Sequence, residues 1–356
     1  MNRTSLLLLV LFLPIALFLP SSRADESLWL KYNDSGMDAL NHADYREAER
    51  LLTAALKEAE NFGPQDSRLA TSLNNLALLC KKQGKYSEAE PLYKRALAID
   101  EKVLGPNHPY VAGDLNNLAA LYYTQGKYTE AEALLKRSLA IREKALGANH
   151  ADVAESLNNL AELYNSQGKY TEAEPLYKRA LAILEKALGP NHPNVATSLN
   201  NLAELYNNQG NYTEAEPLYK RSLAILEKAF GPSHPDVANS LNNVAGLYEK
   251  QGKYSEAEPL YRRSLAIREK VLGPNHADVA QSLNNLASLY CKEGNYAEAE
   301  PLLKRTLVIY EKKLGPDHPD VATSLENYAE LLRKTNRKTE AATLEARAKT
   351  IRAGYK

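Results

Sequence analysis

Six of the seven histidines recur at one spacing, and imidazoles in a regular pattern could bind a metal ion. They occupy positions 108, 150, 192, 234, 276 and 318, so 42 residues separate each from the next. Zinc holds its nitrogen ligands at about 2.0–2.1 Å, whereas equivalent residues on packed helices lie about 10 Å apart. Proline follows four of these histidines and is favoured at the first helical position. We therefore expect helix starts, with a pH-responsive role as the alternative, and no metal or cofactor.

The two cysteines could act as nucleophiles or form a disulfide. Cys80 takes a position that tyrosine holds in later units, so we expect it to be buried and inert. Cys291 falls one position later and should be exposed. Five intervals of 42 residues separate the two thiols, which excludes a bridge within an extended chain. An exposed thiol outside the cytosol can pair between molecules, so Cys291 is our candidate for an intermolecular disulfide.

Other patterns that support catalysis do not occur in the sequence. There is no serine in a strand-turn-helix elbow and no phosphate-binding glycine loop, and each carboxylate pair belongs to a repeating column. Catalysis generally needs one cluster unlike the rest, so we expect a protein that is not an enzyme. Lysine and arginine total 44, as do aspartate and glutamate, and this balance predicts no binding to nucleic acid.

Paired asparagines form the most regular polar pattern in the chain. The pairs are Asn74 and Asn75, Asn116 and Asn117, Asn158 and Asn159, Asn200 and Asn201, Asn242 and Asn243, and Asn284 and Asn285, with Asn327 keeping half of a seventh. Asparagine is a poor helix former, so its recurrence needs a reason. An amide offers both donors and an acceptor, and it can hydrogen-bond a peptide main chain whatever the peptide's sequence.

These residues recur because the chain repeats a 42-residue unit. Glycine stands at positions 63, 105, 147, 189, 231, 273 and 315, and another glycine falls inside most units. In a typical unit we expect one helix from His192 to Gln209 that ends at Gly210, and a second that begins near Tyr212 and ends at Gly231. Each unit therefore holds two helices.

The second helix of each unit carries two sequence patterns that share one glutamate. Ser or Thr stands three residues before a glutamate, as in Thr213 and Glu216, which predicts a capping box. That glutamate precedes a basic residue by four, at positions 90 and 94, 132 and 136, 174 and 178, 216 and 220, 258 and 262, and 300 and 304. This order favours an ion pair along one helix, so we interpret the basic segments as a solvated outer face.

The large, small and aromatic positions of the unit resemble the tetratricopeptide repeat. The residues that carry the resemblance are Leu199, Leu202, Ala203, Tyr206, Gly210, Tyr212, Ala215, Tyr219 and Ser222. The 42-residue length and junctions similar to "LGPNHPDVA" resemble the subclass found in kinesin light chains. The resemblance covers residues 28 to about 354. It implies an all-α, right-handed superhelical solenoid of about eight helix pairs.

In such arrays one stripe of the first helix lines a concave groove, and the resemblance implies that the asparagines lie there. On a helical wheel of residues 197–212, Asn200 and Asn201 fall opposite the apolar face. We expect them to bind an extended peptide. The alternative is that they hydrogen-bond between adjacent helices and fix their stacking, and both can hold. A straight groove would span roughly 60 Å and hold up to about 18 residues of peptide.

Variable charged positions would then select the ligand. Lys81 and Lys82 lie near one end, Glu162 and Glu204 in the middle, and Lys250, Lys292, Arg333 and Lys334 toward the other end. Opposite charges attract, so we expect a ligand that is basic at its centre and acidic where it meets the last repeats.

Residues 1–24 differ from the rest of the chain. Arg3 precedes an apolar run over 6–20, and the small residues Ser22 and Ala24 suit a cleavage site. About 15 apolar residues fall short of the roughly 20 that span a bilayer. We expect a cleavable secretory signal, cut after Ala24, rather than an uncleaved anchor, and a secreted or periplasmic protein with no stable membrane span.

The predicted organisation is a signal peptide over 1–24, an atypical helix pair over 25–62, six repeats over 63–314 and a closing helix pair over 315–356. The function that we expect is a scaffold for protein or peptide ligands. A self-assembling structural element and a regulatory or chaperone subunit of an envelope enzyme are the alternatives. Motor attachment is not expected, because the heptad segment of kinesin light chains is absent.

Overall fold

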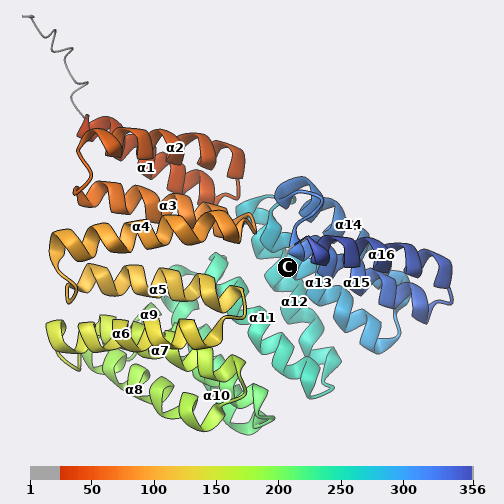
Figure 1. Cartoon of the computed structure of the whole chain (residues 1–356). Coiled ribbons are helices and arrows are strands. Elements are labelled where there is room, and N and C mark those ends of the chain that lie inside the picture. The colour runs from red at the N-terminus through yellow and green to blue at the C-terminus, as the bar shows by residue number, and fades with distance from the viewer. Residues whose placement is uncertain (1–24, 355–356) are drawn as a thin grey trace, which may run out of the picture.

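The computed structural model describes residues 25–354 and arranges them as sixteen α-helices in eight consecutive pairs (Figure 1). The first helices of the pairs, called A helices, are α1 (Glu26–Asn41), α3 (Ser67–Lys82), α5 (Pro109–Thr124), α7 (Ala151–Ser166), α9 (Pro193–Asn208), α11 (Pro235–Lys250), α13 (Ala277–Glu293) and α15 (Pro319–Lys334). The second, called B helices, are α2 (Tyr45–Asn61), α4 (Tyr86–Leu104), α6 (Tyr128–Leu146), α8 (Tyr170–Leu188), α10 (Tyr212–Phe230), α12 (Tyr254–Leu272), α14 (Tyr296–Leu314) and α16 (Lys338–Ala353). The predicted all-helical solenoid is confirmed.

Histidine begins six of the A helices, as the spacing predicts. The His192 Nδ1 atom accepts the backbone N–H of Asn194 at 3.1 Å, and the five equivalent histidines accept in the same way. One of the N–H groups that a helix start leaves without an intrahelical partner is thereby satisfied. Accepting at Nδ1 places the proton of a neutral ring on Nε2.

The turn between A and B helices is closed by backbone hydrogen bonds around a glycine. In the second pair, the N–H of Lys85 donates to the carbonyl of Cys80 and the N–H of Gly84 donates to that of Lys81. This is a Schellman arrangement, and it requires the left-handed backbone of Gly84, whose φ is +75°. Helix A therefore ends at the residue that the glycine pattern predicts, to within one position.

The predicted capping box does not form. The B helices begin one residue before the Ser or Thr, at Tyr86 and its equivalents, and no side chain caps α4, α6, α8, α10, α12, α14 or α16. The glutamate of the pattern instead accepts a tyrosine hydroxyl from the next A helix, as when Tyr164 donates to Glu132 at 2.9 Å. Five other tyrosines do the same. Bonds between repeats have replaced the predicted local cap.

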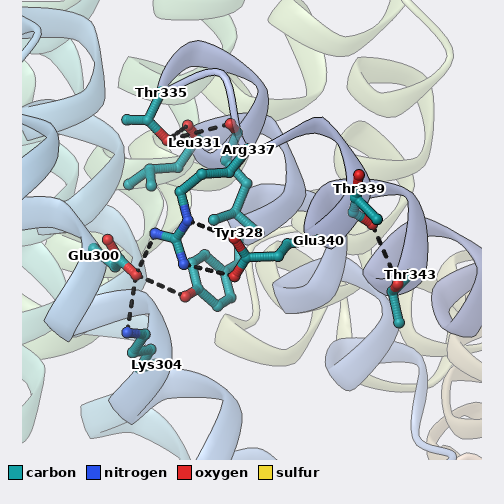
Figure 2. Close-up of polar contacts among 10 residues, drawn as sticks. Glu300, Lys304, Tyr328, Leu331, Thr335, Arg337, Thr339, Glu340 and Thr343 are labelled. Atoms are coloured by element: carbon teal, nitrogen blue, oxygen red, sulfur yellow. Dashed lines mark hydrogen bonds and ion pairs between the residues drawn. The ribbon is translucent and has the colours of Figure 1, made fainter.

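The six predicted ion pairs along the B helices are confirmed, with nitrogen–oxygen distances from 2.6 to 2.9 Å. Figure 2 shows the last of them, where Glu300 accepts from Lys304, from the Tyr328 hydroxyl and from Arg337. Lys304 first, and then Arg337, lower the pKa of Glu300 to about 2. One carboxylate thus joins two neighbouring pairs.

The A helices form the inner wall of the solenoid. Each A helix packs on its own B helix and on the B helix before it, and it also contacts the next A helix. Comparable contacts between successive B helices do not occur in residues 25–354, so the B helices spread apart on the outer side. The A helices accordingly line the concave face, as the resemblance implies.

The solenoid curls until its last repeats contact its first (Figure 1). The Nε2 atom of His318, at the start of α15, lies 3.3 Å from the carbonyl oxygen of Lys82, at the end of α3. The inner wall is therefore curved, because small rotations between successive repeats add up over the chain, and the length of roughly 60 Å that a straight groove would have does not apply.

Residues 1–24 lie outside the described part of the chain, and so does the predicted cleavage after Ala24. Among the helices of residues 25–354, none combines the length and the apolar character that crossing a membrane would take.

Candidate functional site

The first asparagine of each pair lies between neighbouring A helices. Asn74 donates to Asp114 of the next A helix at 2.6 Å, and Asn284 accepts from Asn327 of the next at 2.9 Å. Asn158 accepts from Ser198 at 3.4 Å. Asn200 is half-buried, whereas Asn116 and Asn242 are buried. These hydrogen bonds join adjacent repeats at three of the six first positions, whereas the amide atoms of Asn116 and Asn242 have no hydrogen-bond partner within residues 25–354.

The second asparagine of each pair is on the whole more accessible than the first. Asn117 is exposed, and the half-buried members are Asn75, Asn159, Asn201, Asn243, Asn285 and Asn327. Asn75 donates to Asn33 of the first A helix at 2.7 Å, and so takes part in stacking at that end. The second position thus supplies amides that a ligand could reach.

A cavity of about 440 Å³ lies where α13 and α15 meet on the inner wall. Asn285 and Asn327 line it together with Lys292 and Lys334, and Leu303 and Leu331 add apolar surface. A second cavity, of about 290 Å³, lies between α7 and α9, where Asn158, Asn159 and Asn201 line it. Both cavities combine amides with charged groups, and their volumes suit one or two side chains of a ligand.

The middle of the concave face is acidic. Glu162 is half-buried and accepts hydroxyl groups from Tyr177 at 2.8 Å and Tyr123 at 3.5 Å. Glu204 is exposed, yet the surrounding wall removes part of its hydration and Glu162 repels it, and both effects raise its pKa. Two carboxylates held near each other in this way favour a cationic ligand group.

The basic positions toward the last repeats already have partners. Lys250 donates to Asn208 at 3.3 Å, and Lys292 pairs with the buried Glu249 at 2.6 Å. Arg333 forms a two-bond pair with Glu345 of α16. Because that pair holds Arg333 against its own B helix, the exposed Lys334 is better placed than Arg333 to meet a ligand.

At the other end, Lys82 is exposed and Lys81 is half-buried. Burial, and then repulsion from Lys82, lower the pKa of Lys81. The Lys82 carbonyl oxygen contacts His318. This end of the face is therefore occupied in part by the chain's own last repeats.

The cysteines differ from expectation at one position. Cys80 is buried as predicted, and desolvation raises the pKa of its thiol to about 11. Cys291 is half-buried rather than exposed, and it lines the cavity between α13 and α15. Residues at this position of the unit point toward helix B of the same pair. The equivalent residue of the preceding unit, Glu249, accepts the hydroxyl of Tyr261 on α12 at 2.7 Å. Burial likewise raises the pKa of Cys291.

One carboxyl pair was missed by the sequence reasoning. Asp100 of α4 and Asp114 of α5 are 6% and 4% exposed, and their carboxyl groups lie close enough to act on each other. Desolvation raises the pKa of both, that of Asp114 to about 7. Contrary to expectation, Asp100 and Asp114 do not belong to repeating carboxylate columns, because the equivalent residues of later units are Arg, Leu or Tyr at the first position and Ser at the second. The pair is sealed from solvent, so it offers no site for a substrate.

Solved structures similar to this chain include tetratricopeptide repeat proteins. BtubC (BKLC) from P. vanneervenii is 24% identical with a TM-score of 0.51, over 64% of this chain and 89% of that one. A tetratricopeptide repeat protein from Parabacteroides merdae is 20% identical with a TM-score of 0.53, over 87% and 99%. A putative kinesin light chain of Podosopora anserina is 32% identical with a TM-score of 0.48, over 57% and 96%.

No protein of curated function matches the chain. The sequence profile of the tetratricopeptide repeat matches it seven times, over residues 30–102, 69–144, 112–186, 152–228, 195–270, 236–307 and 278–353. These overlapping matches run across nearly all of residues 25–354 and follow the helix pairs of the solenoid. The chain therefore belongs to the tetratricopeptide repeat family.

Proposed function

We propose that the protein is a non-enzymatic scaffold that binds an extended or helical segment of a partner protein on its concave face. The second asparagine of each pair hydrogen-bonds the main chain of that segment. Tetratricopeptide repeats serve protein interaction, and the family assignment supports this class of function.

The cavity between α13 and α15 is the observation that carries the proposal. It places two second-position amides, Asn285 and Asn327, beside the ammonium groups of Lys292 and Lys334 and the apolar side chain of Leu331. Such a combination suits a peptide, which brings main-chain donors and acceptors together with an apolar or acidic side chain.

The charge order along the face sets the polarity of the ligand. Glu162 and Glu204 face its centre, and Lys292 and Lys334 face the end at the last repeats. The ligand is therefore basic at its centre and acidic at that end, because opposite charges speed association and fix the register.

We further propose that the protein acts outside the cytoplasm, which the signal-like composition of residues 1–24 supports. In that setting Cys291, which is half-buried where Cys80 is buried, forms a disulfide with a second molecule. Non-reducing electrophoresis of the protein from its native compartment tests this proposal, and a monomer band alone contradicts it.

Two pools of fluorescein-labelled 15-residue peptides test the binding proposal. One pool has a basic centre and an acidic end, the other has these charges exchanged, and the two share the same composition. The native protein is expected to bind the first pool more tightly in fluorescence anisotropy. Replacing Asn159, Asn201 and Asn243 by Ala should weaken binding of both pools by about tenfold or more, because each main-chain bond contributes about 0.5–1.5 kcal/mol.

The matched control replaces Asn74 by Ala. Asn74 bonds to Asp114 of the neighbouring A helix and lines neither cavity, so the control should lower the melting temperature and leave peptide affinity unchanged. If the triple variant melts at a lower temperature but keeps its affinity, the second asparagines act in stacking and the binding proposal is wrong.

A further inference from the structure

Two of the six helix-starting histidines are buried, although all six make the same local hydrogen bond. His276 is 8% exposed and His318 is 9% exposed. The four earlier ones, His108, His150, His192 and His234, are half-buried or exposed. The sequence around them is nearly identical, so the difference arises from what covers α13 and α15.

The first two repeats cover these histidines. The Lys82 carbonyl oxygen lies 3.3 Å from Nε2 of His318. Ala43 and Gly84, in the A-to-B turns of the first two pairs, are buried, whereas the equivalent glycines at positions 126, 168, 210, 252 and 294 are exposed. We call the contact of these two turns and Lys82 with His276 and His318 the closing contact.

Burial and the bonds to Nδ1 favour neutral rings at His276 and His318. Nδ1 of each ring accepts a backbone N–H, so the single ring proton lies on Nε2. His318 donates that proton to the Lys82 carbonyl, while Nε2 of His276 has no hydrogen-bond partner within residues 25–354. A second proton would break the Nδ1 bond and bury a positive charge.

Charged groups on every neighbouring element act on these rings. His276 faces Asp278 on its own helix, Arg268 on α12, Lys313 on α14 and His42 in the first A-to-B turn. His318 faces Asp320, which in turn lies near Tyr45 of α2, Tyr310 of α14 and Arg352 of α16.

Desolvation is the largest influence on both rings and lowers the pKa of each. It outweighs the attraction of Asp278 and Asp320 and, at His318, the bond to the Lys82 carbonyl, both of which favour the protonated ring. The same His–Asp arrangement occurs at His150 and Asp152, and at His234 and Asp236. Attraction to the carboxylate is thus common to buried and open sites, and burial in the closing contact is what distinguishes His276 and His318.

We propose that the closing contact is an acid-sensitive switch, which holds the superhelix closed at neutral pH and opens it when His276 and His318 take up protons. The open form binds protons more readily than the closed form, so closure is complete above the ordinary histidine pKa of about 6.5. As the pH falls below that value, closure weakens by up to about tenfold per pH unit for each histidine. Opening moves the first and last repeats apart and changes the curvature of the inner wall.

Two measurements on the purified protein test the switch. Nuclear magnetic resonance titration of the histidine ring protons should give lower pKa values for His276 and His318 than for His150 and His234. Small-angle X-ray scattering should show the radius of gyration increasing as the pH falls from 7.5 to 5. Far-UV circular dichroism shows over which part of that range the helix content stays constant, and only that part is compared. Equal pKa values at the four sites, or an unchanged radius over that range, would overturn the proposal.

Matched double variants separate the closing contact from helix capping. Asparagine is a good helix cap and does not titrate. The variant H276N/H318N should therefore lose the acid-dependent expansion, whereas H150N/H234N should expand as the native protein does. If H276N/H318N still expands, or if H150N/H234N abolishes the expansion, other groups control the shape and the proposal is wrong.

Discussion

At the scale of single residues, the buried carboxyl pair makes stability depend on pH. Asp114 has a pKa of about 7 in the fold against an ordinary value of 3.8, so folding takes up a proton. Stability is fully present below the ordinary value and is lost as the pH rises from there to about 7. Asn74 donates to Asp114 and partly offsets the cost of burying the charge.

We predict that Asp114→Asn stabilises the protein at pH 8 by about 1–3 kcal/mol, since an amide can bond both Asn74 and Asp100 without an ionic charge. The gain should shrink toward pH 5. Thermal unfolding across this range checks the prediction, with Asp317→Asn in an exposed loop as the control. A gain of equal size at pH 5 and pH 8 would show that charge burial is not the cause.

The thiols give a second prediction at this scale. Cys80 is buried, and Cys291 is half-buried with a raised pKa, so Ellman's reagent should titrate Cys291 slowly and leave Cys80 unreacted in the native protein at pH 8. In guanidinium chloride both should react at once. Two fast thiols in the native protein would mean that the α3 end of the solenoid opens readily.

Several of these residues could be placed from sequence, and others could not. The histidine caps follow from histidine-proline steps before an apolar stripe, which is a local signal. The tyrosine that bonds Glu132 stands 32 residues later, and the local pattern of Thr129 and Glu132 points instead to a cap that does not form. Aligning the units shows that Asp100 and Asp114 differ from the equivalent residues of other units. That the two carboxyl groups meet becomes apparent only from the packing of α4 against α5.

At the scale of elements, glycine has two opposite roles. Gly147 ends α6 with a φ of +87° and a ψ of 150°, a conformation open to few residues besides glycine. Gly113 lies inside α5, and a Cβ added there meets nothing within 4 Å. The glycines that end helices adopt positive φ values that other residues rarely adopt, so their positions in the sequence predict where the helices end.

We predict that Gly147→Ala destabilises the protein by about 1–3 kcal/mol, whereas Gly113→Ala stabilises it by about 0.5–1 kcal/mol. Denaturation in guanidinium chloride measures both, and each variant serves as the other's control. Equal effects of the same sign would contradict the assignment of strain to the end of α6.

At the scale of the whole molecule, the closing contact couples repeats that are far apart in sequence. Most solenoids transmit stability only between neighbours. Here the last A helix also contacts the end of α3. The sequence could predict the stacking of pairs, since each unit has the same apolar columns. It could not predict closure, which depends on the sum of small rotations between eight pairs.

We predict that Leu325→Ala, in the core of α15, increases hydrogen exchange in α13–α16 and also in residues 78–86, and leaves residues 162–170 unchanged. Truncation of a buried leucine costs about 2–5 kcal/mol, enough to populate opening of the last pairs. Leu199→Ala in α9 is the control and should affect the central pairs. If the increase in hydrogen exchange only declines with sequence distance from Leu325, and residues 78–86 exchange no faster than before, the closing contact does not couple the last repeats to the first.

The closing contact also constrains how this gene product can evolve. Arrays of near-identical units gain and lose copies through unequal recombination, and an open solenoid tolerates such changes because any unit fits beside any other. In this chain the start of α15 must arrive beside the end of α3. Adding or deleting one 42-residue unit would rotate the last helices away from that position, so only one number of units allows this contact to form.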